Sequence, residues 1–180
     1  MNNLMSIIST RFLLLVLAQI LVFSHINFLG YINPMVYILF VILYPIKNDR
    51  MVFLLLSFLI GITIDMFSDS GGMHAAACTT IAYVRPFVLK FCFGAVYEHQ
   101  SVKFQNVEFG SRLTYISILT VIHHLVLFMF EIFDFSRILF ILEKTLYSSI
   151  FTILLCVLLS IIFSKKGKWD SYYFSFLSFS

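Results

Sequence analysis

Apolar residues along this chain gather into six long runs, separated by short stretches that hold charged residues, asparagine or glycine. A helix that spans a membrane needs about 20 mostly apolar residues, with a range of about 17–25. The pattern therefore predicts six transmembrane helices, over residues 12–29, 31–46, 51–68, 73–94, 113–133 and 138–163. The predicted fold class is an all-α integral membrane protein, with a transmembrane domain over 1–164 and a cytoplasmic aromatic and basic tail over 165–180.

Two of these runs allow another interpretation. The second run is short, and Asn33 followed by Pro34 is typical of an N-cap with proline in the first helical turn. Only residues 47–50 separate it from the third run, so a re-entrant pair is the alternative to two full spans. The first run is followed by no small-residue cleavage site, and we expect it to be a retained anchor instead of a signal peptide.

The composition agrees with a protein that lies in lipid. Hydrophobic residues make up 61% of the chain and charged residues 12%, whereas soluble domains average about 45–50% and about 25%. A water-soluble fold of this size could not bury so much apolar surface. The net charge of +3 is too small to indicate a nucleic-acid partner.

Lysine and arginine predict the orientation, because cytoplasmic loops of membrane proteins carry an excess of both. With the N-terminus inside, the outside loops hold only Arg137. The inside segments and their boundary hold nine basic residues: Arg11, Lys47, Arg50, Lys90, Lys103, Arg112, Lys165, Lys166 and Lys168. We therefore expect an even number of spans, with both termini in the cytoplasm. The inside connection over 95–111 is expected to lie at the headgroup level or to contact a partner.

Four ionisable residues lie near the outer ends of the predicted spans: Asp65, Glu131, Glu143 and Lys144. Such residues are costly in a membrane and suggest function by default. A pair between Lys144 and either Asp65 or Glu131 would lower the cost of each charge. One reading is a proton or ion site, and the other is a polar contact between helices or charges that reach the water. We favour the second, because all four residues lie near one interface and long side chains can extend to it.

Arg85 falls near the middle of the fourth run, where an arginine must face protein or water. Pro86 follows it and predicts a kink, because proline removes a backbone hydrogen bond. Its candidate partners are Tyr83, His123, His124 and carbonyl groups released at the kink. The two histidines cannot face one site together, because adjacent residues on a helix point about 100° apart.

The fourth run also carries a stripe of small residues, Ala75, Thr79 and Ala82, which predicts a seam for close helix packing. The three cysteines, Cys78, Cys92 and Cys156, each lie inside an apolar run and are interpreted as small buried hydrophobes. Metal-ligand spacings, Gly-rich phosphate loops and hydrolase motifs are absent from the sequence. We therefore expect no cofactor, no metal and no catalytic centre.

Residues 61–86 resemble the MreD family of rod shape-determining proteins. The resemblance is carried by GITIDMFS at 61–68, GMHAAA at 72–77 and AYVRP at 82–86. The number of runs, the chain length and the predicted cytoplasmic termini are also similar to that family. By this resemblance the family-characteristic positions are Asp65, Gly72, His74, Arg85 and Pro86.

The resemblance implies a non-catalytic scaffold of the bacterial cell-elongation machinery, in the inner membrane, that guides peptidoglycan synthesis. The implied partners are MreC, the actin-like MreB, RodA and its penicillin-binding transpeptidase. The implied fold is similar to the substrate-binding components of energy-coupling-factor transporters. That fold supports an alternative, a vitamin-binding transporter component, which should have a polar cavity near its outer face. A membrane enzyme that uses Arg85 with His123 or His124 is a third reading.

Overall fold

The computed structural model describes residues 2–25, 33–46, 49–98 and 108–165, and within these ranges every regular element is a helix. The two 3₁₀ turns are η1 (Phe23–His25) and η2 (Phe135–Arg137). The α-helices are α1 (Asn2–Leu21), α2 (Ile38–Ile42), α3 (Arg50–Ser68), α4 (Met73–Glu98), α5 (Phe109–Ile132) and α6 (Ile138–Lys165). The proposed tail beyond residue 165 and most of the 95–111 connection lie outside the described residues.

Four of these helices, α3 to α6, are long and apolar enough to cross a membrane. Their bounds lie within four residues of the predicted runs, since hydrophobic length alone decides such elements. The first helix begins earlier than predicted and ends at Leu21, and its apolar part, Ile8–Leu21, is shorter than a full span. The described part of the chain is therefore all-helical, with four helices suited to a membrane.

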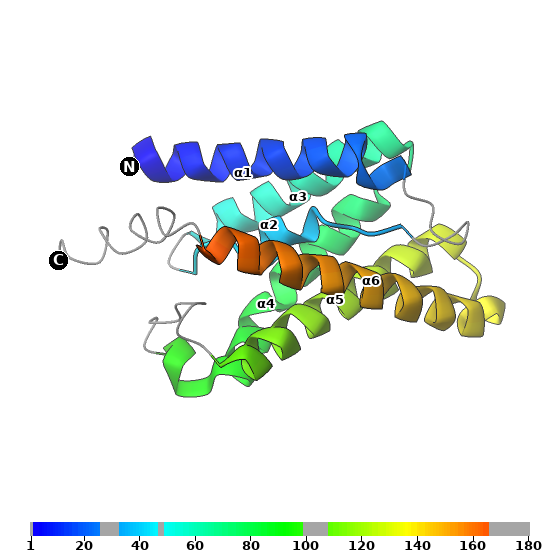
Figure 1. The fold of residues 1–180 in the computed structure, drawn as a ribbon. Coiled ribbons are helices and arrows are strands. Elements are labelled where there is room, and N and C mark those ends of the chain that lie inside the picture. Colours follow the sequence, from blue (N-terminus) through cyan, green and yellow to red (C-terminus); the bar gives the residue numbers. More distant parts are fainter. Residues whose placement is uncertain (1, 26–32, 47–48, 99–107, 166–180) are drawn as a thin grey trace.

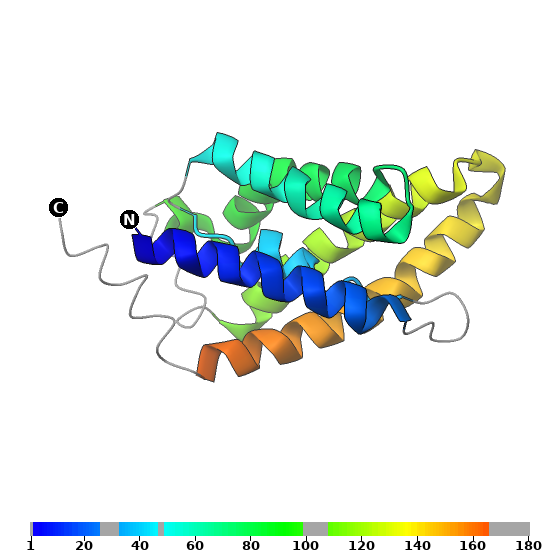
Figure 2. The same ribbon diagram turned by 90° about the horizontal axis from the view of Figure 1, so that it is seen from above.

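The long helices run back and forth between two ends of one bundle (Figure 1). α1 begins and α6 ends at the same end, called here the N-terminal end, and this end also holds the start of α3 and the start of α5 (Figures 1 and 2). The opposite end holds the α3–α4 and α5–α6 turns. Each of α3, α4 and α5 packs against the next helix along the chain.

The second run differs from its prediction. Its described part, residues 33–46, contains only the five-residue helix α2, which begins after Tyr37, so the predicted helix start at Asn33 and Pro34 is wrong. The segment returns from the opposite end to the N-terminal end through the middle of the bundle (Figure 1). Residues 34–42 are all buried. We call residues 33–46 the internal segment.

Length explains why this segment is not one helix. A helix over residues 31–46 would be only about 24 Å long at 1.5 Å per residue. The hydrocarbon core of a bilayer is about 30 Å thick. Only the five residues of α2 are helical, and the residues on both sides of it are irregular. Irregular backbone can advance by more than about 1.5 Å per residue, which lets the segment cross the bundle. This crossing also disagrees with the re-entrant alternative.

The fourth helix contains a break that the sequence did not predict. Helical backbone angles continue through Pro86, where the expected kink stays a prediction, and the non-helical residue inside α4 is Gly94, with φ of 48°. Glycine tolerates this left-handed region. The apolar span of α4 ends at this same glycine.

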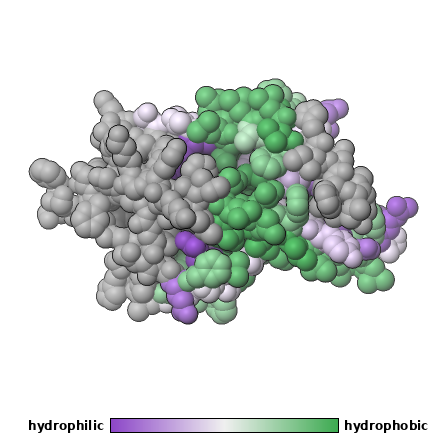
Figure 3. Space-filling view, in the orientation of Figure 1, coloured by the Kyte–Doolittle hydropathy of each residue, from purple (hydrophilic) through white to green (hydrophobic). Residues whose placement is uncertain are grey.

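Apolar side chains cover the outward faces of the helices. On α6, exposed residues follow one another at helical spacing, and they include Leu139, Leu142, Leu146, Ile150, Leu154 and Leu158. Figure 3 shows an apolar area across the middle of one face, with hydrophilic residues toward the two ends. Outside the spans, Asp134 accepts hydrogen bonds from the Ser136 hydroxyl and N–H, and these bonds hold the pKa of its carboxyl below the usual value.

Candidate functional site

The α3–α4 turn is held by one carboxylate, that of Asp65. Its oxygens accept the backbone N–H groups of His74 (3.0 Å) and Ala75 (2.8 Å), which are among the first N–H groups of α4. The Ser70 hydroxyl donates to the same carboxylate at 2.6 Å, and His74 Nδ1 lies 3.0 Å from it. A carboxylate at a helix N-terminus is stabilised by the unpaired N–H groups and by the helix dipole. Asp65 therefore caps the next helix across the turn.

Two features of the sequence bring Asp65 to this position. A Cβ built on Gly61 would lie 2.4 Å from the Ala75 Cα, so only glycine lets α3 and α4 approach this closely. The turn itself uses left-handed backbone at Asp69, Gly71 and Gly72, with φ of 51°, 63° and 95°. Glycine adopts these angles without strain. The sequence therefore folds the chain so that the end of α3 meets the start of α4.

Arg85 holds the end of the internal segment. Its side chain is 3% exposed, and its guanidinium donates to the backbone carbonyls of Tyr44 and Ile42 and to the Tyr115 hydroxyl. Tyr115 in turn donates to the Ile42 carbonyl at 3.0 Å. The Arg85 guanidinium also lies over the Phe53 ring, 5.0 Å from its centre. The predicted partners His123, His124 and Tyr83 are not hydrogen-bonded to Arg85, and the carbonyls come from the internal segment instead of a kink.

Gln19 of α1 holds the start of the same segment. Its amide oxygen accepts the Val36 N–H at 2.8 Å, and its amide nitrogen donates to the Pro34 carbonyl at 3.1 Å. The Met35 N–H donates to the Thr152 hydroxyl of α6 at 3.2 Å. Lipid offers no hydrogen bonds, so backbone outside a helix is tolerated at membrane depth only where protein or water satisfies it. Side chains of four helices, α1, α4, α5 and α6, perform this role here.

The two neighbouring histidines of α5 are completely buried and point to different partners. His123 Nε2 lies 2.9 Å from the Tyr37 hydroxyl, at the start of α2. His124 Nδ1 lies 2.9 Å from the Thr120 carbonyl, and its Nε2 lies 3.3 Å from the Thr152 hydroxyl. Both rings therefore support the internal segment, His123 directly and His124 through Thr152.

A cleft of about 550 Å³ opens at the opposite end of the bundle. His74 lies on its wall, as do Lys144 and Glu131, whose charged groups are 2.7 Å apart. Of the two partners predicted for Lys144, the structure therefore pairs it with Glu131, while Asp65 binds the α4 N-terminus. The polar residues of the lining are Gln19, Ser24, Asn33, Ser68, Asp69, Ser70, His74, Glu131 and Lys144.

The remaining predicted residues take structural positions. Ala75 and Ala82 are buried within the bundle, and Thr79 is partly buried and donates to the Ala75 carbonyl. Within the described residues no group of three or more His, Cys, Asp or Glu could hold a metal ion. Cys78 and Cys156 are buried and Cys92 is partly buried, and none of the three is in a disulfide.

Sequence reasoning did not single out Gln19, Tyr37, Tyr115 or Thr152, although all four are buried and bind the internal segment or its anchors. A glutamine within an apolar run was the one available signal, since an amide in hydrocarbon needs partners. A threonine or tyrosine in such a run carries no comparable signal. Comparison with protein family models, with curated proteins and with solved structures finds no match to this chain.

Proposed function

We propose that the chain is a non-catalytic scaffold of the bacterial inner membrane, similar to MreD, that acts in the cell-elongation machinery. Its proposed partners are MreC, MreB, RodA and a penicillin-binding transpeptidase, and its proposed role is to position them for peptidoglycan synthesis. One observation carries the proposal. Both charged residues of the motif that resembles the family, Asp65 and Arg85, bind backbone groups of the protein itself.

This use of the charges favours a scaffold over an enzyme. A catalytic residue must reach a substrate, whereas Asp65 and Arg85 are 4% and 3% exposed and bind the α4 N-terminus and the internal segment. The contacts of Asp65 join α3 to α4, and those of Arg85 join α4 to α5 and to the internal segment. A rigid bundle with apolar outward faces is suited to holding other membrane proteins in fixed positions.

We further propose that all six passes cross the inner membrane, the second as the internal segment, with both termini in the cytoplasm. An even number of passes and the excess of basic residues at the N-terminal end support this orientation. A similar number of passes also underlies the proposed similarity to the substrate-binding components of energy-coupling-factor transporters. Reporter domains fused to each terminus should both report the cytoplasm, and a periplasmic signal from either terminus would contradict the topology.

The cellular role is tested by deletion in the source bacterium. Loss of the protein should turn rods into rounded cells, and the wild-type gene should restore them. Affinity purification of the tagged full chain from crosslinked membranes should recover the proposed partners, with an unrelated six-pass membrane protein as the matched control. Normal cell shape, together with recovery of none of these partners, would contradict the proposal.

A second candidate function is supported by the cleft. A component that binds a small molecule for a transporter needs a polar-lined cavity at its outer face. The cleft lies at the end of the bundle opposite the N-terminal end, and polar residues line part of it. The purified chain would then release one small molecule on denaturation, detected by mass spectrometry, and Lys144→Met would abolish its retention. Arg137→Gln is the control, because Arg137 lies at the same end but not in the cleft lining. An empty wild-type protein would eliminate this candidate.

A further inference from the structure

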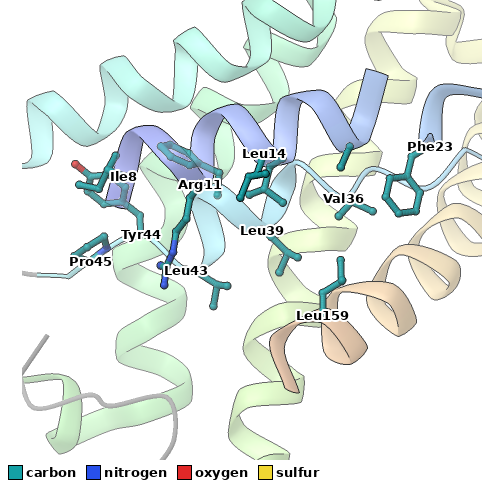
Figure 4. A pocket seen from close by; sticks show the side chains of 13 residues that line it. Ile8, Arg11, Leu14, Phe23, Val36, Leu39, Leu43, Tyr44, Pro45 and Leu159 are labelled. Atoms are coloured by element: carbon teal, nitrogen blue, oxygen red, sulfur yellow. The ribbon is translucent and has the colours of Figure 1, made fainter. Parts of the chain in front are cut away.

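A second cavity, an apolar groove of about 280 Å³, lies on the side of the bundle. α1 forms one wall, Leu159 of α6 forms the other, and residues of the internal segment form the floor (Figure 4). Figure 4 shows Leu14 and Arg11 of α1 pointing into the groove. We propose that this groove binds one acyl chain of an anionic phospholipid, whose phosphate is held by Arg11.

The lining and the size decide the kind of occupant. Of the thirteen residues that line the groove, twelve are uncharged and mostly apolar. An apolar groove at membrane depth is filled by hydrocarbon, because lipid tails are the solvent there. The groove, at about 280 Å³, is just below the range of about 300–1,000 Å³ for cavities that hold a drug-sized molecule. This volume has room for part of one acyl chain and not for a helix, which is about 10–12 Å wide with its side chains.

The positive charge of Arg11 favours a lipid with an anionic headgroup. It is the one charged residue among those that line the groove, and it is partly buried. Figure 4 shows its guanidinium directed toward Leu43, on the side of the groove where Pro45 lies. Those residues end the internal segment at the N-terminal end of the bundle. Long arginine side chains extend along apolar surface toward the headgroups. A guanidinium has five N–H donors and binds phosphate with two parallel hydrogen bonds.

The residues at the bottom of the groove belong to the internal segment, so a bound acyl chain would contact this segment. Leu39 and Phe40 belong to α2, are 1% and 4% exposed, and line the groove. A bound chain would therefore lie directly on the internal segment. It would cover the side of this segment that α1 and α6 leave open, so the lipid would complete the packing around the non-helical pass.

Photolabelling tests the occupant directly. The full chain is placed in nanodiscs of phosphatidylethanolamine with a small share of phosphatidylglycerol that carries a diazirine in its acyl chain. We expect label on Leu39, Phe40 or Leu43, which bulk lipid on the outward faces does not reach. Unlabelled phosphatidylglycerol should compete with this label. Label confined to outward residues such as Leu146 and Ile150 would overturn the proposal.

Variants at Arg11 test the binding of the phosphate headgroup separately from the binding of the acyl chain. Native mass spectrometry from equimolar phosphatidylglycerol and phosphatidylethanolamine should show one retained phosphatidylglycerol on the wild-type protein. Arg11→Gln should lower that preference about fivefold, since one basic residue contributes about 1 kcal/mol to anionic lipid binding. Arg112→Gln, at the same end and outside the groove, should leave the preference unchanged. An unchanged preference in Arg11→Gln, or an equal loss in Arg112→Gln, would overturn the role of Arg11.

Filling the groove provides the last arm of the test. Leu14→Trp should occupy the groove and remove lipid retention, whereas Leu13→Trp, on the same helix and outside the lining, should not. If Leu14→Trp lowers the melting temperature below that of the wild type, Leu159→Trp replaces it as the filling variant. Full lipid retention by a folded filling variant would overturn the proposal, as would a protein partner crosslinked to the groove in place of lipid.

Discussion

The side chain of Gln19 and the backbone of Val36 are joined by a hydrogen bond of 2.8 Å. Gln19 belongs to α1 and Val36 to the internal segment, and the same glutamine also donates to the Pro34 carbonyl. A single amide therefore satisfies a donor and an acceptor of a backbone that has no helix to pair them. Together with Arg85 and Thr152, it explains how a largely non-helical segment is stable inside an apolar bundle.

Gln19→Leu should lower the free energy of unfolding by about 2–6 kcal/mol, because it leaves the Val36 N–H and the Pro34 carbonyl without this partner and each unpaired buried polar group costs about 1–3 kcal/mol. The effect is measured by equilibrium unfolding in mixed micelles. Leu17 is an exposed residue on the same helix, and Leu17→Ala should lower the free energy of unfolding by no more than about 0.5 kcal/mol. Equal stability of Gln19→Leu and the wild type would show that the internal segment does not depend on this amide.

Arg85 and Tyr115 should behave as one unit, since they bind each other and both bind the Ile42 carbonyl. Arg85→Met and Tyr115→Phe should each destabilise the fold. The free energy of unfolding of the double variant should fall by less than the sum of the two single losses, with an interaction energy of about 0.5–3 kcal/mol. Arg85→Lys should not restore stability, because a lysine cannot reproduce the geometry of the guanidinium fork. Strict additivity in the double-mutant cycle would contradict the network.

Gly61→Ala should destabilise the protein by about 1–3 kcal/mol or more, the range for overpacking a close contact. The added Cβ would lie 2.4 Å from the Ala75 Cα, which is backbone and cannot rotate away. Gly110→Ala is the matched control, because a Cβ there meets open space and Gly110 lies within α5. The comparison uses thermal unfolding in the same detergent, and similar melting temperatures for both variants would disprove the close approach of α3 and α4.

Asp65→Asn should loosen the first turn of α4 while leaving the rest of that helix protected. One carboxylate oxygen is replaced by an amide nitrogen, which cannot accept an N–H group, so His74 or Ala75 loses its partner. Hydrogen exchange should accelerate at these two amides and not at Ile81 or Ala82 in the helix interior. Asp69→Asn, at an exposed residue of the same turn, should leave the exchange rates of all four amides unchanged. Unchanged exchange rates in Asp65→Asn would show that Asp65 does not cap α4.

The bounds of the four long helices were predicted well from the sequence, and the structure of the second apolar run was predicted badly, for a physical reason. An apolar run long enough to span lipid must be helical, because only a helix satisfies its own backbone there. A shorter run carries no such constraint when other parts of the protein surround it. A short apolar run alone cannot distinguish a helix from a buried extended segment. The second run falls in this category, and its predicted helix was wrong.

The candidate site could be predicted only in part. Asp65 and Arg85 stand out from the sequence because charges in apolar runs require partners. Both bind backbone groups, which are close along the chain for Asp65 and distant for Arg85, such as the Tyr44 carbonyl. A pattern of residue types carries no information about backbone partners. The hydrogen bond from Met35 to Thr152 joins residues 117 positions apart. Such contacts depend on how the helices pack, which hydropathy does not encode.

The central claim is that residues 33–46 cross the bundle with only residues 38–42 in a helix. Solid-state NMR of the isotope-labelled full chain in lipid bilayers tests it most directly, through the backbone Cα and Cβ chemical shifts of this segment. The account predicts helical shifts at Ile38–Ile42 and non-helical shifts at 33–35 and 44–46. Continuous helical shifts from 33 to 46 would contradict it.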